Sequence, residues 1–136
     1  KIKTSFKHQS AVFADKNMIE TVFRNILNNS IKFSYEDGLV TVETSENENF
    51  IIVRVIDKGF GIDSSFVDKL FDLSCRMIEE GTNGEKGSGL GLTLARKMAR
   101  LINGDILVES QLGVGSKFTL VLPGMTDYEI KPDLRR

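Results

Sequence analysis

The chain has 136 residues, of which 40% are hydrophobic and 27% are charged, as expected for one globular domain with a core. Eighteen basic and nineteen acidic side chains leave a net charge of −1, so no basic field favours nucleic acid or anionic lipid as a partner. The lone Cys75 cannot form an internal disulfide, and the apolar runs are too short to span a membrane. We therefore expect a cytoplasmic segment that makes no direct membrane contact.

Hydrophobic periodicity predicts the elements in chain order. Residues 1–14 are expected to form two short strands, the second at Ala11–Ala14. A helix follows from an N-cap at Asp15 to about Phe33, because apolar pairs recur every four residues there. The other predicted elements are strands at 39–44 and 49–56, a short helix at 63–70, a helix at 90–102, and strands at 105–110 and 117–122.

This order of elements predicts hairpins rather than βαβ units. The expected fold class is α+β, a two-layer α/β sandwich whose mixed, mostly antiparallel sheet carries its helices on one face. Residues 1–124 are expected to form the domain, with 125–136 as a tail or linker and the glycine-containing stretch 72–87 as a lid. Because the chain starts at Lys1 without Met, we also expect a further domain upstream.

A polar stripe runs along the first predicted helix. Thr21, Asn25, Asn29 and Lys32 are spaced so that they share one face. A solvated helix face is the ordinary alternative, but Asn is a poor helix former and such a face has no need of it. Amide oxygens suit Mg²⁺, which usually bridges to substrate phosphates, and a lysine one turn further on supplies positive charge for those phosphates. The stripe therefore predicts a magnesium and phosphate site.

Two glycine-containing segments are further candidates. Asp57-Lys58-Gly59-Phe60-Gly61-Ile62 follows a predicted buried strand, where it is either an ordinary turn or a place where the backbone approaches a flat ligand with Asp57 in the pocket. Gly87, Gly89 and Gly91 alternate immediately before a helix. Backbone N–H groups at such a helix start favour a phosphate, although a flexible loop is the alternative.

Five segments together resemble the ATP-binding catalytic domain of sensor histidine kinases, which has the Bergerat fold of the GHKL superfamily. The segments occur in the family's order and cover nearly the whole chain; they are 25–34, 57–62, 70–73, 87–92 and 115–123. The resemblance implies ATP and Mg²⁺ as cofactors, and transfer of the γ-phosphoryl group to a histidine. That histidine would lie on an adjoining dimerisation domain upstream, and a response regulator would be an indirect partner.

The resemblance also implies roles for the residues that would surround the base. Asp57 would accept a hydrogen bond from the adenine amino group, and Gly59 and Gly61 would shape the floor beneath the base. Ile62 belongs to the same motif and is included as a nucleotide-binding position. Ser116 would supply a hydroxyl on the adenine side.

On the phosphate side, the resemblance implies that Asn29 ligates Mg²⁺, Asn25 supports the metal or its water, and Lys32 contacts phosphate. Arg76 falls where the family often has a lid arginine near the γ-phosphate. Phe71 would anchor the base of the lid, and the hinge and phosphate-binding turn would comprise Gly87, Gly89, Leu90, Gly91 and Leu92.

The sequence departs from the pattern at Thr21, where related ATPases carry a water-activating Glu; Glu20 points about 100° away on a helix. A hydroxyl cannot replace a carboxylate base, which favours phosphotransfer to histidine over hydrolysis. His8 lies between two predicted strands and is interpreted as a surface turn residue rather than the acceptor. Two alternatives stay open: a catalytically silent nucleotide-binding module, and a serine-directed kinase or ATPase switch of the same superfamily.

Overall fold

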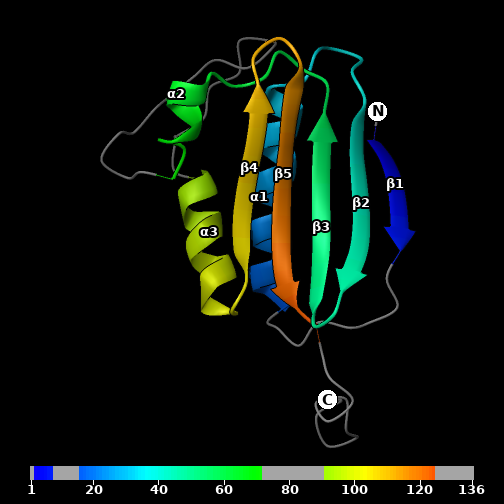
Figure 1. Ribbon diagram of the computed structural model, residues 1–136, viewed down its shortest axis with the longest axis vertical. Coiled ribbons are helices and arrows are strands. Elements are labelled where there is room, and N and C mark those ends of the chain that lie inside the picture. The colour runs from blue at the N-terminus through cyan, green and yellow to red at the C-terminus, as the bar shows by residue number, and fades with distance from the viewer. Residues whose placement is uncertain (1, 8–15, 72–90, 125–136) are drawn as a thin grey trace, which may run out of the picture.

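Five strands form a single sheet in the computed structural model, which describes residues 2–7, 16–71 and 91–124. Across the sheet the order is β1-β2-β3-β5-β4 (Figure 1). The strands are β1 (Ile2–Lys7), β2 (Val40–Asn47), β3 (Phe50–Asp57), β4 (Asp105–Gln111) and β5 (Gly115–Pro123). Apart from the β1–β2 pair, all neighbouring strands are antiparallel, so the predicted α+β fold with a mixed, mostly antiparallel sheet is confirmed.

Two long helices cover one face of this sheet. They are α1 (Lys16–Lys32) and α3 (Gly91–Leu101), and α2 (Ser64–Val67) is a single turn near β4 (Figure 1). The apolar pairs that predicted α1 place Val22 and Ile26 in the core, while Glu20 and Arg24 stay exposed. α1 therefore buries one side against the sheet and α3, and its polar stripe lies along the border of that buried side.

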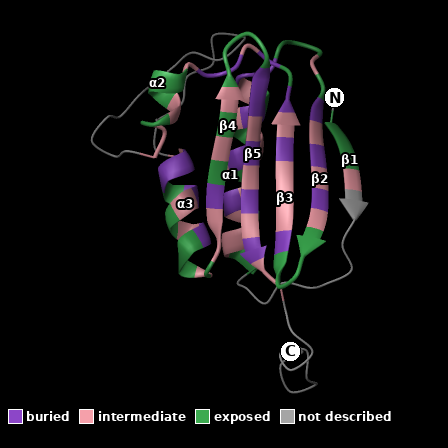
Figure 2. Cartoon of the chain, viewed as in Figure 1, coloured by how far each residue is buried: buried purple, intermediate pink, exposed green. Residues whose placement is uncertain are grey.

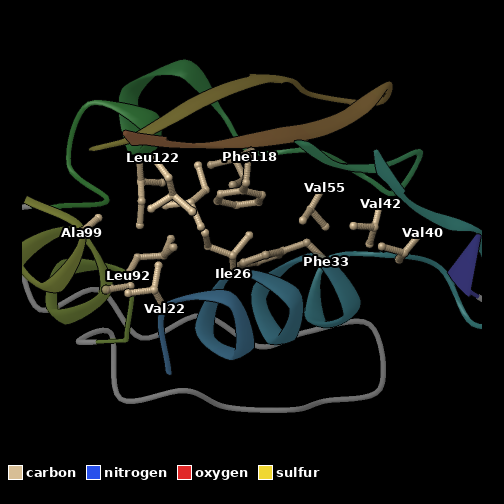
Figure 3. Packing of buried hydrophobic residues seen from close by; sticks show 14 residues of the cluster. Val22, Ile26, Phe33, Val40, Val42, Val55, Leu92, Ala99, Phe118 and Leu122 are labelled. Atoms are coloured by element: carbon tan, nitrogen blue, oxygen red, sulfur yellow. The ribbon is translucent and has the colours of Figure 1, made fainter. Parts of the chain in front are cut away.

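The core lies between the helices and the sheet. Ile26 and Phe118 are fully buried where α1 meets β5, and both belong to the cluster drawn in Figure 3. Along β5, residues 116, 118, 120 and 122 are buried and alternate with half-buried residues, a pattern visible in Figure 2. This period of two is what a sheet covered on one face requires.

One connection differs from the sequence prediction. β1 and β2 are parallel neighbours, with Ile2 opposite Val40, so β1-α1-β2 is a βαβ unit where only hairpins were expected. α1 carries the chain from one end of the sheet to the other, and β2 can therefore enter the sheet in the same direction as β1. The predicted hairpins β2–β3 and β4–β5 are confirmed.

The remaining predictions concern the ends of the two later helices and three segments that the structure does not describe. α2 is shorter than the helix predicted over 63–70, with Asp63 as its N-cap accepting from the Ser65 N–H at 2.9 Å. α3 ends as Asn103-Gly104 predicted: Asn103 has φ 64°, and the Gly104 N–H donates to the Ala99 carbonyl at 2.8 Å, as in a Schellman motif. The predicted strand at 11–14, the lid at 72–87 and the tail at 125–136 lie outside the described residues.

Candidate functional site

The polar stripe of α1 forms what we call the helix group, Asn25, Asn29 and Lys32. The Nδ2 of Asn25 donates to the Thr21 carbonyl at 2.9 Å, and the Nδ2 of Asn29 donates to the Asn25 carbonyl at 2.9 Å. Both side chains are half-buried, and their amide protons are directed back into the helix. Each amide oxygen Oδ1 is then the atom available to a ligand, and it is a hard oxygen donor that suits Mg²⁺.

The start of α3 packs directly on the helix group. A Cβ added to Gly91 would lie 2.8 Å from the Oδ1 of Asn25, closer than any real side chain would tolerate. Glycine at this position lets the first turn of α3, with its outward N–H groups, approach the Asn25 amide. Next along the chain, Leu92 is buried in the core, so its side chain is unavailable to a nucleotide and only its backbone N–H could serve one.

Asp57 ends β3 and carries the most unusual electrostatics in the described part of the chain. Its side chain is 2% exposed; Oδ1 accepts from the Gly59 N–H at 2.9 Å, while Oδ2 is buried without a hydrogen-bond partner among the described residues. Burial raises the pKa of this carboxyl, and the backbone N–H groups of Gly59 and Ser116 offset part of that rise. A buried acceptor left open in this way suits a donor brought by a ligand.

Close backbone packing fixes the turn after Asp57. A Cβ at Gly59 would collide with the Phe33 carbonyl oxygen, and one at Gly61, which has φ +74°, would collide with the Gln111 carbonyl oxygen. Between them, the Phe60 N–H donates to the Phe33 carbonyl at 3.2 Å. Phe33 follows α1 directly, and therefore the turn is attached to the same end of α1 that carries Asn29 and Lys32.

A pair of serine hydroxyls lies at the β4–β5 hairpin. Ser110 Oγ is 2.8 Å from Ser116 Oγ, donates to the Gly115 carbonyl at 3.0 Å and accepts from the Ile62 N–H at 2.8 Å. Ser116 is 3% exposed and lies opposite Asp57 in the β3–β5 register. We call Asp57, Gly59, Gly61, Ser110 and Ser116 the strand group.

Ser110 is a site residue that the sequence motifs did not predict. Ser110 lies opposite Ser116 in the β4–β5 hairpin, and two serines placed at matching distances from the hairpin turn are the signal that could have identified it. Ile62, the nucleotide-binding position predicted beside Gly61, has its side chain in the core and its N–H bound to Ser110. Like Leu92, it therefore has a buried side chain, and it supports the turn that carries Gly61.

Phe71, the predicted anchor of the lid, is held by α3. The guanidinium of Arg96 lies 4.3 Å from the centroid of the Phe71 ring, and its Nε donates to Asp105 Oδ1 at 3.0 Å. Arg100 Nε reaches the same oxygen at 3.2 Å. Burial raises the pKa of Asp105, but hydrogen bonds from Arg96, the Ile106 N–H and Arg100 outweigh it and hold the pKa below its usual range.

The strand group and the end of α1 meet at one end of the molecule, the top of the view in Figure 1, where β3 finishes and β5 begins. The predicted site residues Arg76, Gly87, Gly89 and Leu90 lie outside the described residues, as do His8 and Cys75. Within the described ranges, no group of three or more His, Cys, Asp or Glu side chains could hold a metal.

Residues 14–125 match the family model of the histidine kinase-, DNA gyrase B- and HSP90-like ATPases. The chain belongs to this family. Sensor histidine kinase WalK of Bacillus subtilis is 36% identical over 117 residues, which cover 85% of this chain and 19% of WalK. Sensor histidine kinase RcsC of Escherichia coli is 34% identical over 116 residues, covering 83% of this chain and 12% of RcsC. The chain thus spans less than a third of the length of these curated relatives.

Solved structures of histidine kinases share the fold of this ATPase domain. A mycobacterial sensor kinase, MprB, superposes with a TM-score of 0.74 at 23% identity, over 90% of this chain and 82% of its own. The structure of full-length ShkA, in complex with AMPPNP, superposes with a TM-score of 0.72 at 23% identity, over 92% of this chain and 26% of its own. WalK, RcsC and MprB are all sensor histidine kinases, as the resemblance implied. No helix in the described ranges of the chain is long and apolar enough to cross a membrane.

Proposed function

We propose that this ATPase domain binds Mg-ATP and transfers the γ-phosphoryl group to a histidine on an adjoining dimerisation domain. In this step a bond forms between phosphorus and an imidazole nitrogen, the bond from phosphorus to the β–γ bridging oxygen breaks, and ADP leaves. The observation that carries the proposal is the Asp57 carboxylate, which is 2% exposed and whose Oδ2 has no donor among the residues that the structure describes. An adenine amino group is a donor of the right kind for that oxygen.

The strand group is proposed to hold the base. Gly59 and Gly61 bring the backbone of the turn against the end of α1 and the β4–β5 hairpin, and the base is proposed to lie against this turn. The hydrogen bond from the Gly59 N–H fixes the Asp57 carboxylate, so Oδ2 is oriented before the base arrives. Fixing an acceptor in advance lowers the ordering cost of binding.

The helix group is proposed to serve the phosphates. Asn29, with Asn25 in support, would offer amide oxygens to Mg²⁺, and Lys32 in the last turn of α1 would contact phosphate oxygens. When bound, Mg²⁺ supplies neutralisation of the phosphate charge that develops during transfer. The Gly91 turn adds backbone N–H groups beside Asn25, and we extend the phosphate-binding turn to Gly87, Gly89 and Leu90.

The side chains at positions 20 and 21 of α1 favour phosphotransfer over hydrolysis by water. The Thr21 hydroxyl donates to the Asn17 carbonyl at 2.9 Å, and a neutral hydroxyl used in this way cannot take a proton from water. The Glu20 side chain is half-exposed and lies 3.9 Å from Lys16 Nζ. The nucleophile is therefore proposed to be an imidazole nitrogen of the partner histidine, on a domain that would precede this one. A response regulator would act on the phosphorylated partner.

We also propose that residues 1–124 form the ATP-binding catalytic domain and that 125–136 are a C-terminal tail or linker. Radiolabelled ATP added to the longer protein should give acid-labile phosphate on a histidine, and Asp57→Asn should reduce the labelling at low ATP. The exposed Ser64→Ala is the matched control and should leave labelling unchanged. Release of inorganic phosphate by this chain alone, abolished by Glu20→Gln, would contradict the proposal because it would make the domain a hydrolase.

A further inference from the structure

The hydroxyl of Ser110 makes three hydrogen bonds, and their partners come from the turn after β3 and from the start of β5. The Ile62 N–H lies in the turn after β3, the Gly115 carbonyl begins β5, and the third partner is the Ser116 hydroxyl. A serine hydroxyl has one proton to donate and two lone pairs that accept. Three partners therefore use its full hydrogen-bonding capacity.

The identity of these partners fixes the direction of each bond. The Ile62 N–H can only donate, and the Gly115 carbonyl can only accept, so the single proton of Ser110 goes to Gly115. The 2.8 Å bond between the hydroxyls must then use the proton of Ser116. Ser116 Oγ is left with lone pairs alone and acts as an acceptor toward any other group.

This acceptor lies beside a second one. Ser116 and Asp57 are opposite each other in the β3–β5 register, and both side chains are buried on the helix-covered side of the sheet. Directly opposed residues on one face are neighbours, and Asp57 Oδ2 has no donor among the described residues. A ligand that reaches this point meets two acceptors and no hydroxyl donor.

We propose that Ser110 is a positioning residue that sets base specificity, because by taking the Ser116 proton it keeps Ser116 an acceptor facing the purine 6-position. This inference rests on the proposed nucleotide-binding function. A 6-amino group, as in adenine, donates to both acceptors. A 6-oxo group, as in hypoxanthine or guanine, places its own acceptor against them and is rejected.

The test compares ADP with IDP. The two differ at the purine 6-position in having an amino or an oxo group, and at N1, which accepts in adenine and carries a proton in hypoxanthine. Calorimetry with Mg²⁺ present gives the ratio of the IDP and ADP dissociation constants for the whole chain. In Ser110→Ala the Ser116 hydroxyl is free to turn and donate to the oxo group, so the ratio should fall about fivefold, the scale of one hydrogen bond. Ser110→Thr keeps the hydroxyl and should keep the ratio, as should the exposed control Ser64→Ala.

A purely structural role for Ser110 predicts something different. Losing the Ile62 and Gly115 bonds would then weaken ADP and IDP equally and leave the ratio unchanged, which would overturn the proposal. Ser110→Cys guards against a misfolded alanine variant, because it has nearly the same shape but a thiol that accepts poorly; its ratio should fall as well. Combining Ser110→Ala with Ser116→Ala should lower the ratio no further than Ser116→Ala alone, and additive losses would also overturn it. A wild-type chain that binds neither nucleotide would overturn the proposed function itself.

Discussion

The strand group and the helix group reach the same end of the molecule by different routes. In the strand group, contacts join residues distant in sequence: Gly59 packs on the Phe33 carbonyl, Gly61 on Gln111, and Ser110 binds the Ile62 N–H. In the helix group, the side-chain hydrogen bonds of Asn25 and Asn29 stay within α1, each one turn back. The first group therefore depends on the tertiary fold, whereas the second is organised by one helix. Mutations in the strand group should accordingly affect folding as well as ligand binding, whereas mutations in the helix group should affect mainly ligand binding.

The largest effect is expected from Gly59→Ala. The new Cβ collides with the Phe33 carbonyl oxygen, and because both partners are backbone the clash cannot be relieved by a side-chain rotation. We expect the free energy of unfolding to fall by about 3 kcal/mol or more, with loss of nucleotide binding. Urea denaturation followed by circular dichroism measures the change in the free energy of unfolding. Gly113→Ala is the control: its Cβ meets nothing within 4 Å, and its φ of +82° costs only about 1 kcal/mol.

Asn29→Ala tests the other half of the comparison. It removes one amide oxygen and one bond within the helix, so we expect the Mg²⁺-dependent part of ADP affinity to fall about 10–100-fold, the scale seen for groups that support a metal. The free energy of unfolding should change by less than about 1 kcal/mol. Calorimetry of ADP binding with Mg²⁺ and with EDTA separates the Mg²⁺-dependent part of the affinity from the Mg²⁺-independent part. Asn28→Ala, exposed on the same helix, should leave both unchanged, and a Mg²⁺-independent loss would refute the ligand role.

Asp57→Asn should separate binding from stability within the strand group. The amide brings a donor where the base amino group needs an acceptor, so the preference for ADP over IDP should fall about tenfold. The pKa of Asp57 is raised by burial, so its contribution to stability is fully present below the unfolded pKa and is lost as pH rises through the folded pKa. The free energy of unfolding of the variant minus that of the wild type should therefore be more positive at pH 7 than at pH 4. Urea midpoints at the two pH values measure this, and a pH-independent difference would contradict it.

The smallest effects are expected at the edge of the helix layer. Arg96→Ala removes both the stacking on Phe71 and the bond to Asp105, and should cost about 1 kcal/mol; the more exposed Arg100→Ala should cost about half of that. The pKa of Asp105 is lowered, so its stabilisation is present above the unfolded pKa and is lost as pH falls through the folded pKa. Thermal unfolding of each variant at pH 7 and pH 3 measures the loss of stability and its pH dependence. Equal losses for the two variants would show that the contact between Arg96 and Phe71 does not contribute to stability.

Local signals in the sequence predicted most elements. The apolar pairs of α1, the two hairpins and the Asn103-Gly104 stop all depend on neighbouring residues, and the structure confirms them. The parallel pairing of β1 with β2 was missed because its partner strands are separated by the whole of α1. The order of elements along the chain does not say which strand lies beside which in the sheet. Pairing between consecutive strands joined by a turn was therefore the expectation.

The candidate site shows the same division. Asp57, Gly59 and Gly61 are adjacent in sequence and were predicted as one motif, as were Asn25 and Asn29 on one stripe. Ser110 was missed because its role comes from the register of β4 on β5 and from the distant Ile62. The close packing of Gly91 on Asn25 likewise joins two helices, and no local pattern predicts that contact.

The register of β3 on β5 has a consequence for how the domain folds. β2–β3 and β4–β5 are hairpins closed by short turns, whereas Asp57 and Ser116 are about sixty residues apart and meet only when the two hairpins pair. Closing that long loop costs more chain entropy than closing either turn, so the hairpins are expected to form first. During refolding, a nucleotide would then meet the two acceptors proposed to recognise its base only once the hairpins have paired. Its binding would stabilise the paired sheet without accelerating the formation of the hairpins.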